Sequence, residues 1–428
     1  MAAQNRNRVV ITGLGVVAPN GVGVPDFENA IKSGKSGIAF VPELEELNFR
    51  CTIGGIPNVT NELLAANFTV LELKRLSAKG VIYGILAGLE AWQNANLNFS
   101  ESDEPNWNYG TFFGAGLSGI NTLREAIYKT DDLKVRKLGT TMVEQTMPSA
   151  ISAFLGGKLG LGNQVTTNAS ACSTGTESIL MAYERIREGK ATVMLAGSCD
   201  ADSPHVWGGF DAMRVLNYKR NDSPSSASRP MADDAAGFVP GSGAGALVLE
   251  SLDSAKNRGA TIYGEIAGGF MNSGGQRRGG TMTAPNSTGI QRCIEGALKD
   301  ADITGDKVNL ISGHLTSTMG DVPEIENWSK ALGLSGKDFP KVNSLKSMTG
   351  HCLSAAGSIE SVACVLQLKG NYTHPSINCE NVHPDILENI DESCIPHKLL
   401  DQENAIIAKS SFGFGDVNSC IIFKKYPA

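Results

Sequence analysis

Short β-branched and apolar segments recur along the whole chain, and longer stretches with helical periodicity separate them. The first segment covers residues 8–12, and we expect it to end at Gly13. The amphipathic stretch 176–188 is typical of the intervening helices, and later strand-like segments are residues 111–113, 164–167 and 191–196. Strands that alternate with helices pack as a sheet covered by helices, so the pattern predicts an α/β protein.

The pattern breaks once and then starts again, which predicts two halves. Residues 218–245 are rich in Ser, Asp, Pro and Gly, as loops are, and a strand-like segment follows at 246–250. A second α/β series begins at residues 263–267 and runs to Phe423. We therefore expect halves at 1–255 and 256–428, with a duplicated architecture of βαβ units.

Charge and composition exclude several classes of protein. The 37 Lys and Arg residues against 44 Asp and Glu leave a net charge of −7 with no basic block, so we expect no nucleic-acid partner. No stretch approaches the roughly 18 apolar residues of a membrane span, and the first 17 residues lack the features of a signal peptide. We expect a cytoplasmic protein without a membrane partner, whose nine cysteines, without a Cys-x-x-Cys pair, are reduced thiols.

Cys172 is the most informative single residue. It lies among the small residues of segment 168–175, between a predicted strand and the predicted helix 176–188. A thiol at a helix N-terminus faces the positive end of the helix dipole, which predicts a lowered thiol pKa and attack on a thioester or peptide carbonyl. The alternative is that Cys172, like most cysteines of such a protein, is a small buried hydrophobic residue.

Two histidines follow strand-like runs in polar segments that contain glycine. These are His314 and His351, and a neutral imidazole in such a place can donate a hydrogen bond to an oxyanion or relay a proton. Each could equally be a structural histidine. The sequence has no His-x-x-x-His pair or local cluster of Cys and His, so we expect no metal. A cysteine protease would leave one histidine and Lys346 without a role.

The segment that follows the first strand weakly matches a dinucleotide-binding pattern. Gly13 and Gly15 fit G-x-G-x-x-A, but Pro19, Asn20 and Gly21 interrupt the helix that should begin there. A nicotinamide oxidoreductase therefore stays open as one hypothesis for the function, and tight binding of a nucleotide would favour it.

Taken together, these motifs closely resemble the elongating β-ketoacyl-acyl-carrier-protein synthases, over nearly the whole chain. The shared features are Cys172 in its small-residue segment, His314 in His-x-Thr-Ser-Thr, Lys346 and His351 in Lys-Ser-Met-Thr-Gly-His, and Phe-Gly-Phe-Gly at 412–415. The resemblance implies a thiolase-like fold with two duplicated halves in five layers, α-β-α-β-α. It also implies a homodimer and an acyl carrier protein as partner.

The resemblance assigns a role to each motif residue. Cys172 would carry the acyl chain as a thioester, and His314 and His351 would promote decarboxylation of malonyl-carrier protein, as neutral donors to the developing enolate. The backbone N–H groups of Cys172 and Phe414 would form the oxyanion hole, with Phe414 also gating the acyl pocket. The remaining assignments are Glu360 holding Lys346, Glu324 as a supporting carboxylate, Thr316 and Thr318 on the pantetheine arm, and Leu117, Phe238 and Phe412 at the acyl chain.

The chain departs from the family pattern at four places. Leu315 stands where the family has glycine after the first histidine, Asp416 replaces the second glycine after Phe-Gly-Phe, and Ala235-Ala236 replaces Arg-Asp. At a monovalent-cation site of the family, Ser312 and Lys409-Ser410 replace Asn and Ser-Asn, whereas Glu324 and Glu360 are retained. We hypothesise that the Lys409 ammonium replaces the cation and neutralises both carboxylates directly.

The resemblance predicts a decarboxylating condensing enzyme that needs no cofactor and extends acyl chains on a carrier protein. The pathway would be fatty-acid synthesis or a type II polyketide or polyene pathway. A non-catalytic chain-length partner in a ketosynthase heterodimer is the alternative, although such partners usually lack the cysteine that this chain retains as Cys172. Arg277-Arg278 or Lys219-Arg220 could contribute a basic patch for an acidic carrier protein.

Overall fold

Two five-strand series with the same strand order form the central sheet of this computed structural model, which describes residues 6–99 and 102–427. Part of the N-terminal segment used in the signal-peptide argument lies outside these residues. The first series has the order β6-β5-β7-β8-β1, with bounds Val165–Thr166, Tyr109–Ala115, Val193–Asp200, Gly243–Ser251 and Val9–Ala18. The second has the order β11-β10-β14-β15-β9, with bounds Lys341–Asn343, Leu310–Ser312, Ile406–Gly413, Val417–Lys424 and Gly264–Ser273.

Strand directions repeat between the two series as well. In the first series, β5 runs parallel to β6 and β7, and β8 is antiparallel to β7 and β1. In the second series, β10 runs parallel to β11 and β14, and β15 is antiparallel to β14 and β9. Antiparallel pairing of β1 with β9 joins the series, for example Val9 opposite Ile266. The duplicated α/β architecture is therefore confirmed. The expected boundary at residue 255 lies within helix α11 (Leu252–Asn257), between the two series.

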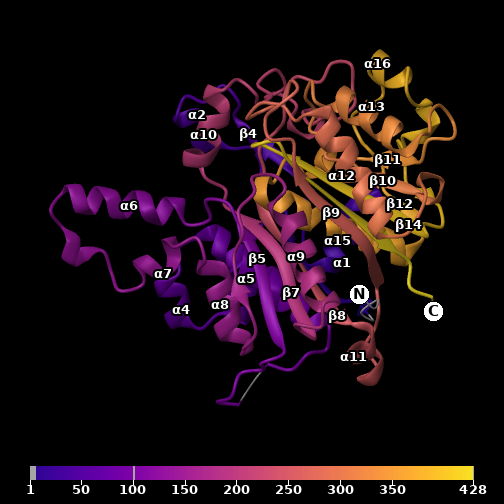
Figure 1. Ribbon diagram of the computed structural model, residues 1–428. Helices are drawn as coiled ribbons and strands as arrows, with labels where there is room; N and C mark the ends of the chain where they lie inside the picture. The colour runs from indigo at the N-terminus through magenta and orange to yellow at the C-terminus, as the bar shows by residue number, and fades with distance from the viewer. Residues whose placement is uncertain (1–5, 100–101, 428) are drawn as a thin grey trace.

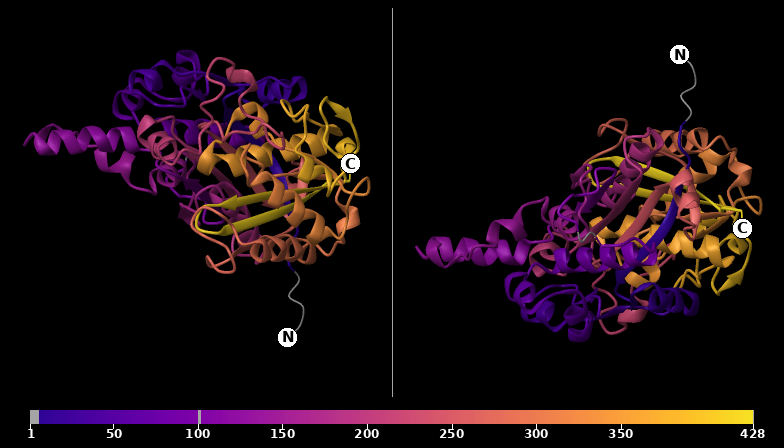
Figure 2. Two further views of the ribbon diagram at one scale, coloured as in Figure 1. Left: turned by 90° about the horizontal axis from the view of Figure 1, so that it is seen from above. Right: turned by 90° about the horizontal axis from the view of Figure 1, so that it is seen from below.

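Helices form three layers around the strands, as Figures 1 and 2 show. The helices α9 (Thr174–Arg187) and α15 (Ala356–Gly370) pack against each other and against strands of both series, in the middle of the molecule. The first series is covered outside by α5 (Lys79–Asn94) and α8 (Ala150–Leu159), and the second by α12 (Ser287–Asp300) and α13 (Asp321–Leu332). The apolar side chains between layers form three large clusters, which gives the thiolase-like order α-β-α-β-α.

Strand β1 is longer than the sequence pattern predicted. It continues past Gly13 to Ala18, because the glycines are part of the strand and allow helix α5 to approach it closely. A Cβ atom on Gly13 would lie 2.1 Å from the carbonyl oxygen of Ala91, and one on Gly15 would lie 2.0 Å from that of Ala87. The Gly-x-Gly pattern thus serves strand–helix packing, because both glycines lie inside β1 and the next helix, α1 (Val24–Ser33), begins only after β2 (Gly21–Val22).

A helical arm formed by residues 117–147 extends away from the layered body (Figures 1 and 2). It contains α6 (Ile120–Asp131), η1 (Val135–Lys137) and α7 (Met142–Thr146). Several large apolar side chains of the arm are exposed, including Ile127 at 52%, Leu133 at 93% and Val143 at 69%. Among the helices of the described residues, none has the length and apolar character that crossing a membrane requires.

Smaller elements complete the fold. The helices are α1 (Val24–Ser33), α2 (Pro42–Glu46), α3 (Asn61–Asn67), α4 (Val70–Arg75), α10 (Pro204–Ala212), α14 (Lys346–Thr349) and α16 (Pro384–Leu387). The strands are β2 (Gly21–Val22), β3 (Ile38–Phe40), β4 (Ile53–Gly55), β12 (Tyr372–Thr373) and β13 (Leu400–Asp401). The remaining 3₁₀ turns are η2 (Pro224–Ser226), η3 (Gly305–Lys307), η4 (Leu353–Ala355) and η5 (Glu392–Cys394).

Candidate active site

Cys172 lies in a sharp turn directly before helix α9, as the sequence predicted. Ala171 has a φ of 48°, in the left-handed region, and this brings the chain into the helix over very few residues. The Thr174 hydroxyl stabilises the turn by accepting a hydrogen bond of 2.7 Å from the Ser170 N–H. Of the nine cysteines, Cys172 alone is partly exposed, and the other eight are buried.

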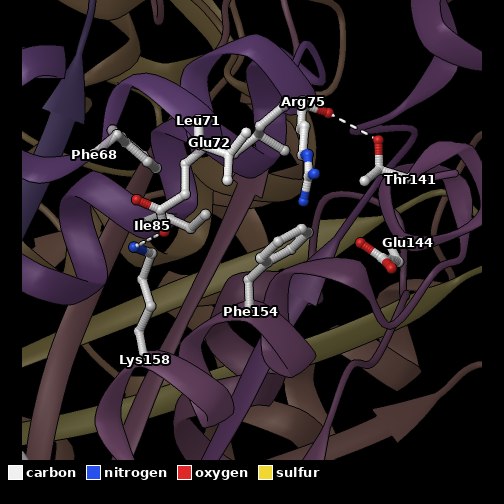
Figure 3. A pocket seen from close by; sticks show the side chains of 10 residues that line it. Phe68, Leu71, Glu72, Arg75, Ile85, Thr141, Glu144, Phe154 and Lys158 are labelled. Atoms are coloured by element: carbon white, nitrogen blue, oxygen red, sulfur yellow. Dashed lines mark hydrogen bonds and ion pairs between the residues drawn. The ribbon is translucent and has the colours of Figure 1, made fainter. Parts of the chain in front are cut away.

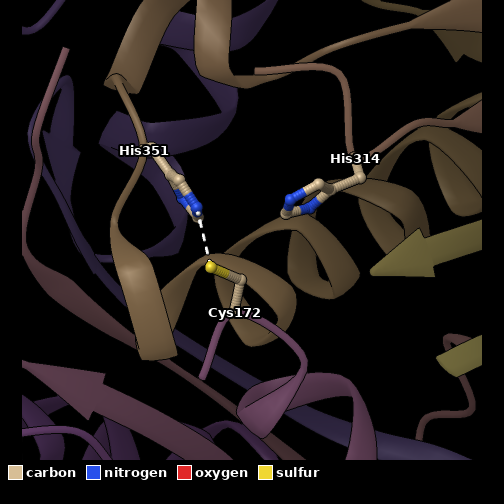
Figure 4. Close-up of side chains that lie close together, drawn as sticks. All are labelled: Cys172, His314 and His351. Atoms are coloured by element: carbon tan, nitrogen blue, oxygen red, sulfur yellow. Dashed lines mark hydrogen bonds between the residues drawn. The ribbon is translucent and has the colours of Figure 1, made fainter. Parts of the chain in front are cut away.

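Cys172, His314 and His351 come together in space although they are far apart in the sequence (Figure 4). One ligand atom of each lies within 4.8 Å of the others, and the two imidazole centroids are 5.4 Å apart. His351 Nε2 lies 3.1 Å from Cys172 Sγ. The other ring nitrogen, Nδ1, accepts a hydrogen bond of 3.3 Å from the Leu353 N–H, so in the neutral ring the proton is on Nε2, which donates toward the sulfur.

Both imidazoles are neutral. Desolvation lowers the pKa of His314 and of His351 well below the usual value, and the nearby Lys346 ammonium lowers each further. His314 Nδ1 is buried and has no hydrogen-bond partner among the described residues. The site therefore presents two uncharged imidazoles beside one sulfur, which is suited to stabilising a developing negative charge.

The thiol pKa differs from the sequence-based expectation. The helix dipole was expected to lower it, but desolvation dominates and raises the pKa of Cys172 to about 11, against the opposing effects of Lys346 and the Phe414 N–H. The residue as a whole is partly exposed, but protein atoms crowd around the sulfur itself. At neutral pH the site therefore holds a thiol beside neutral imidazoles.

Glu360 pairs with two buried ammonium groups, Lys346 and Lys409, whose charges act on both histidines. Lys346 Nζ contacts Oε1 of Glu360, and Lys409 Nζ lies 2.8 Å from its Oε2. All three side chains are at most 2% exposed. Lys409 also donates to the Ser410 carbonyl and, at 3.0 Å, to the Ser411 hydroxyl. Two ammonium groups of the protein thus compensate the Glu360 charge.

Glu324 is stabilised differently, which corrects part of the Lys409 hypothesis. Its carboxylate accepts the backbone N–H groups of His314, at 2.6 Å, and Leu315, at 2.7 Å, and the Ser410 hydroxyl at 3.3 Å. Within the described residues no ion pair joins it to Lys409, whose ammonium pairs with Glu360 instead. Burial raises the pKa of Glu324 to about 7, so this carboxyl group is partly neutralised by protonation.

The loop after His314 is fixed by a carboxylate that sequence reasoning missed. Asp321 accepts the N–H of Thr316 at 2.7 Å and that of Ser317 at 3.0 Å. The hydroxyls of Thr316 and Thr318 lie 2.9 Å apart. Leu315, which stands where the family has glycine, is not among the left-handed residues of this loop, whereas Ser317 is, with a φ of 65°. An Asp at the start of helix α13 was the available signal, because acidic residues there commonly bind free N–H groups.

Aromatic rings line one side of the site. Phe238 contacts the His351 ring at a centroid distance of 5.3 Å and Phe210 at 5.4 Å, and Phe210 lies 6.1 Å from Phe414. Phe412 approaches His314 at 6.3 Å. Phe414 is half-buried at the tip between β14 and β15. The three sequence-predicted aromatic residues, Phe238, Phe412 and Phe414, therefore lie near the histidines or beside Phe210.

Leu117 lies at the start of the helical arm, and its expected place beside the acyl chain stays a prediction. It is 56% exposed at the base of the helical arm and lines a small cavity with residues such as Gln145 and Met147. A further cavity, of about 190 Å³, lies between α4 and α8 (Figure 3). It combines an apolar floor containing Phe154 with the ion pair of Glu72 and Lys158, and no cysteine or histidine is among its described lining residues. Neither cavity includes the nucleophile.

The sequence predicted no metal site, because it has no His-x-x-x-His pair and no local cluster of Cys and His. The structure nevertheless brings three possible metal ligands together. One thiol and two imidazoles within 4.8 Å could bind a divalent cation such as Zn²⁺. Binding through His351 Nε2 would require loss of the proton that the Leu353 N–H fixes there. The donor set therefore fits a hydrogen-bonding site better than a metal centre.

The thiolase-like fold, with a cysteine before a central helix and two neutral imidazoles above it, defines a class of enzymes that form covalent acyl-cysteine thioesters. The N-terminal domain model of the β-ketoacyl synthases matches residues 6–255, and the C-terminal domain model matches residues 263–380. The chain belongs to the β-ketoacyl synthase family.

Relatives match over nearly the full chain. The chain is 34% identical to 3-oxoacyl-[acyl-carrier-protein] synthase 2 of Vibrio harveyi, covering 98% of this chain and 99% of that one. It is 33% identical to 3-oxoacyl-[acyl-carrier-protein] synthase I, chloroplastic, of Arabidopsis thaliana, covering 98% and 87%. A solved complex of a type II polyketide synthase acyl-carrier protein with its ketosynthase bound to the hexaketide matches with a TM-score of 0.87, 32% identity, and coverage of 98% and 100%.

Proposed function

We propose that this chain catalyses the decarboxylating condensation of an acyl thioester, held on Cys172, with malonyl-acyl-carrier protein. The product is β-ketoacyl-acyl-carrier protein. The observation that carries the proposal is the position of Cys172 Sγ beside two neutral imidazoles. His351 donates from Nε2 to the sulfur at 3.1 Å, and His314 Nδ1 has no hydrogen-bond partner among the described residues. The names of the relatives point to the same chemistry.

In the first half-reaction, Cys172 sulfur attacks the carbonyl carbon of the acyl thioester. The new carbon–sulfur bond forms as the bond to the carrier's pantetheine sulfur breaks, and the thiol proton leaves with that sulfur. The N–H groups of Cys172 and Phe414 stabilise the negative charge on the carbonyl oxygen, and the Phe414 N–H already points to the sulfur. Phe414 would also act as the gate, because its ring closes the aromatic side of the site.

In the second half-reaction, the malonyl group loses carbon dioxide. The electrons of the broken carbon–carbon bond form an enolate, whose oxygen accepts hydrogen bonds from His351 Nε2–H and a ring N–H of His314. The enolate carbon attacks the acyl-Cys carbonyl, and the Cys172 thiolate leaves and regains a proton. Neutral imidazoles suit this step, because a charged imidazolium would protonate the carbanion and quench it.

The carrier protein and the two halves of the chain have defined places in the proposal. Residues 1–255 supply the nucleophile, and residues 256–428 supply both histidines. Thr316 and Thr318, half-buried near His314, would bind the pantetheine arm. The names of two relatives include an acyl-carrier protein, and one similar solved structure is a complex of a ketosynthase with its acyl-carrier protein. The protein would act in the cytoplasm, in fatty-acid or type II polyketide or polyene synthesis.

A homodimer is the proposed assembly, formed through the helical arm. Ile127, Leu133 and Val143 are exposed apolar side chains on this arm, and a second copy packed against the arm would remove them from water. Sedimentation of the purified chain should give twice the mass of 45.1 kDa, and Ile127→Glu with Val143→Glu should give a monomer. A wild-type chain that stays monomeric until a second subunit is added would favour the heterodimer.

We further propose that the Lys409 ammonium replaces a bound monovalent cation and neutralises the Glu360 carboxylate. It is fully buried, forms an ion pair with Glu360, and donates hydrogen bonds to the Ser410 carbonyl and the Ser411 hydroxyl. Wild-type activity should then be equal in sodium, potassium and tetramethylammonium salts. Lys409→Ala, which opens space beside Glu360, should gain activity with potassium but not with tetramethylammonium. A potassium requirement of the wild type would refute the proposal.

Intact-protein mass spectrometry tests the reaction itself. Wild type should gain the mass of an acyl group from acyl-carrier protein and release β-ketoacyl product when malonyl-carrier protein is added. Cys172→Ala should gain no acyl group, and Cys379→Ala, which removes a buried cysteine, should behave as wild type. Wild-type protein that accepts no acyl group from any donor would overturn the assignment in favour of a non-catalytic subunit.

A further inference from the structure

A buried carboxylate at the end of strand β7 lies beside the turn that follows His351. Asp200, the last residue of β7, is 2% exposed, and hydrogen bonds compensate its charge. Its Oδ1 accepts the Ala201 N–H at 2.9 Å. Its Oδ2 accepts the Ser354 N–H at 3.2 Å and the Ser354 hydroxyl at 2.7 Å. Asp200 therefore joins the first half of the chain to the turn η4, which belongs to the second half.

The contact between Asp200 and Ser354 is built into the packing of this region. A Cβ atom on Gly116, the residue after strand β5, would lie 2.4 Å from Asp200 Oδ2 and 3.0 Å from Ser354 Oγ. Glycine at position 116 therefore leaves the space that the two side chains occupy. Ser354 is also held at its carbonyl, which accepts the Ser198 hydroxyl at 2.7 Å. The position of η4 thus depends on groups of strand β7.

The residue before Ser354 determines where the His351 ring carries its proton. Leu353 has a φ of 51°, in the left-handed region, and its N–H donates to His351 Nδ1 at 3.3 Å. This hydrogen bond keeps the proton of the neutral ring on Nε2, which lies 3.1 Å from Cys172 Sγ. Leucine rarely adopts the left-handed conformation, so the surrounding structure must hold it there. The anchored Ser354 is the next residue of the chain.

A different set of contacts fixes the backbone of His351. Its N–H donates to the Val239 carbonyl at 2.7 Å, and its carbonyl accepts the Gly241 N–H at 2.9 Å. Neither contact determines which ring nitrogen carries the proton. The tautomer of His351 therefore depends on the Leu353 N–H and, through Ser354, on Asp200.

We propose that Asp200 is a positioning residue for His351, which anchors Ser354, holds the Leu353 N–H against Nδ1 and so keeps the ring proton on Nε2. In the second half-reaction this is the proton that His351 donates toward the enolate oxygen. That use rests on the proposed function, whereas the tautomer itself does not. Without the anchor, Leu353 is free to leave the left-handed region, and the ring proton is free to move to Nδ1, which points away from the sulfur.

The test compares Asp200→Ala with Asp202→Ala. Asp202, two positions further on, is also buried, at 6% exposure, but it binds Lys79 and Tyr83 and serves as the matched control. Nitrogen-15 NMR of the histidine-labelled enzyme distinguishes a ring nitrogen that carries the proton from one that does not. The signals of His351 are identified by their loss in His351→Asn. A lower stability alone does not change the tautomer that the folded protein shows.

Wild type and Asp202→Ala should show only the Nε2–H form of His351, whereas Asp200→Ala should also show the Nδ1–H form. Loss of one oxyanion donor lowers kcat by about 10²–10³, so kcat for condensation should fall at least about tenfold in Asp200→Ala. The KM for malonyl-carrier protein should stay unchanged. Acyl transfer to Cys172 should not slow, because an unprotonated Nε2 accepts the thiol proton.

An unchanged His351 tautomer in Asp200→Ala would overturn the proposal, as would the same mixture of tautomers in Asp202→Ala. If Asp200→Ala yields no folded protein, Ser354→Ala decides, because it keeps the carboxylate and removes the hydroxyl bond. A shift toward the Nδ1–H form would then support the role of Asp200, and a wild-type tautomer and kcat would refute it. A changed tautomer in an enzyme whose wild type condenses no substrate would keep the positioning role and refute the proposed function.

Discussion

The charge balance around Glu360 gives the sharpest stability prediction. Glu360→Gln removes the only carboxylate within ion-pair distance of Lys346 and Lys409 among the described residues, and leaves two buried ammonium groups without a counterion. Removing one partner of a buried ion pair costs about 3–5 kcal/mol. Lys409→Met, in contrast, leaves the Lys346–Glu360 pair intact and fills a similar volume, so its cost should stay below about 1.5 kcal/mol.

Thermal unfolding converts these free energies into melting temperatures. An unfolding entropy of about 2.1 cal/mol/K per residue gives about 0.9 kcal/mol/K for 428 residues. Glu360→Gln should therefore lower the melting temperature by about 3–6 °C, and Lys409→Met by less than about 2 °C. Glu326→Gln, which breaks an exposed ion pair with Lys330, is the matched control and should change it by less than about 1 °C.

The double variant decides whether the charge argument is correct. Glu360→Gln with Lys409→Met has one unpaired ammonium where Glu360→Gln has two, so it should melt at a higher temperature than Glu360→Gln alone. The coupling free energy should lie at about 0.5–3 kcal/mol. A double variant that melts below Glu360→Gln, or a Lys409→Met variant as unstable as Glu360→Gln, would refute the reasoning.

Three further predictions follow from the packing and the pKa shifts. Gly15→Ala should give little folded protein in a solubility and circular-dichroism assay, because its Cβ would lie 2.0 Å from a carbonyl oxygen of α5. Burial raises the pKa of Glu324 to about 7, so between about pH 4.5 and 7 the folded state keeps a proton on this carboxyl group that the unfolded state has lost. The free energy of unfolding should therefore fall as pH rises from about 4.5 through 7, and denaturant titrations of Glu324→Gln should show a smaller fall. Iodoacetamide alkylation of Cys172 should accelerate about tenfold per pH unit between pH 7 and 10, because the pKa of its thiol is about 11; a plateau below pH 8 would contradict this.

Local sequence patterns predicted the α/β class, the two series and the nucleophile of the site, whereas the five-layer order came from the family resemblance. The alternation of strands and helices is a local pattern, and it predicted the α/β fold and the restart of a second series near residue 263. The position of Cys172 before an amphipathic helix was equally local, as the bounds of α9 show. Local patterns are readable because each depends on neighbours a few residues away.

The electrostatics of the site and its long-range contacts depend on the tertiary structure. Cys172 and His351 are 179 positions apart, and no local spacing could show that Nε2 would lie 3.1 Å from the sulfur. Three findings depend on which groups are buried next to one another. They are the high pKa of the Cys172 thiol, the ion pair of Lys409 with Glu360, and the extension of β1 past Gly13. Desolvation and close packing are properties of the assembled interior, and a linear pattern of residue types does not contain them.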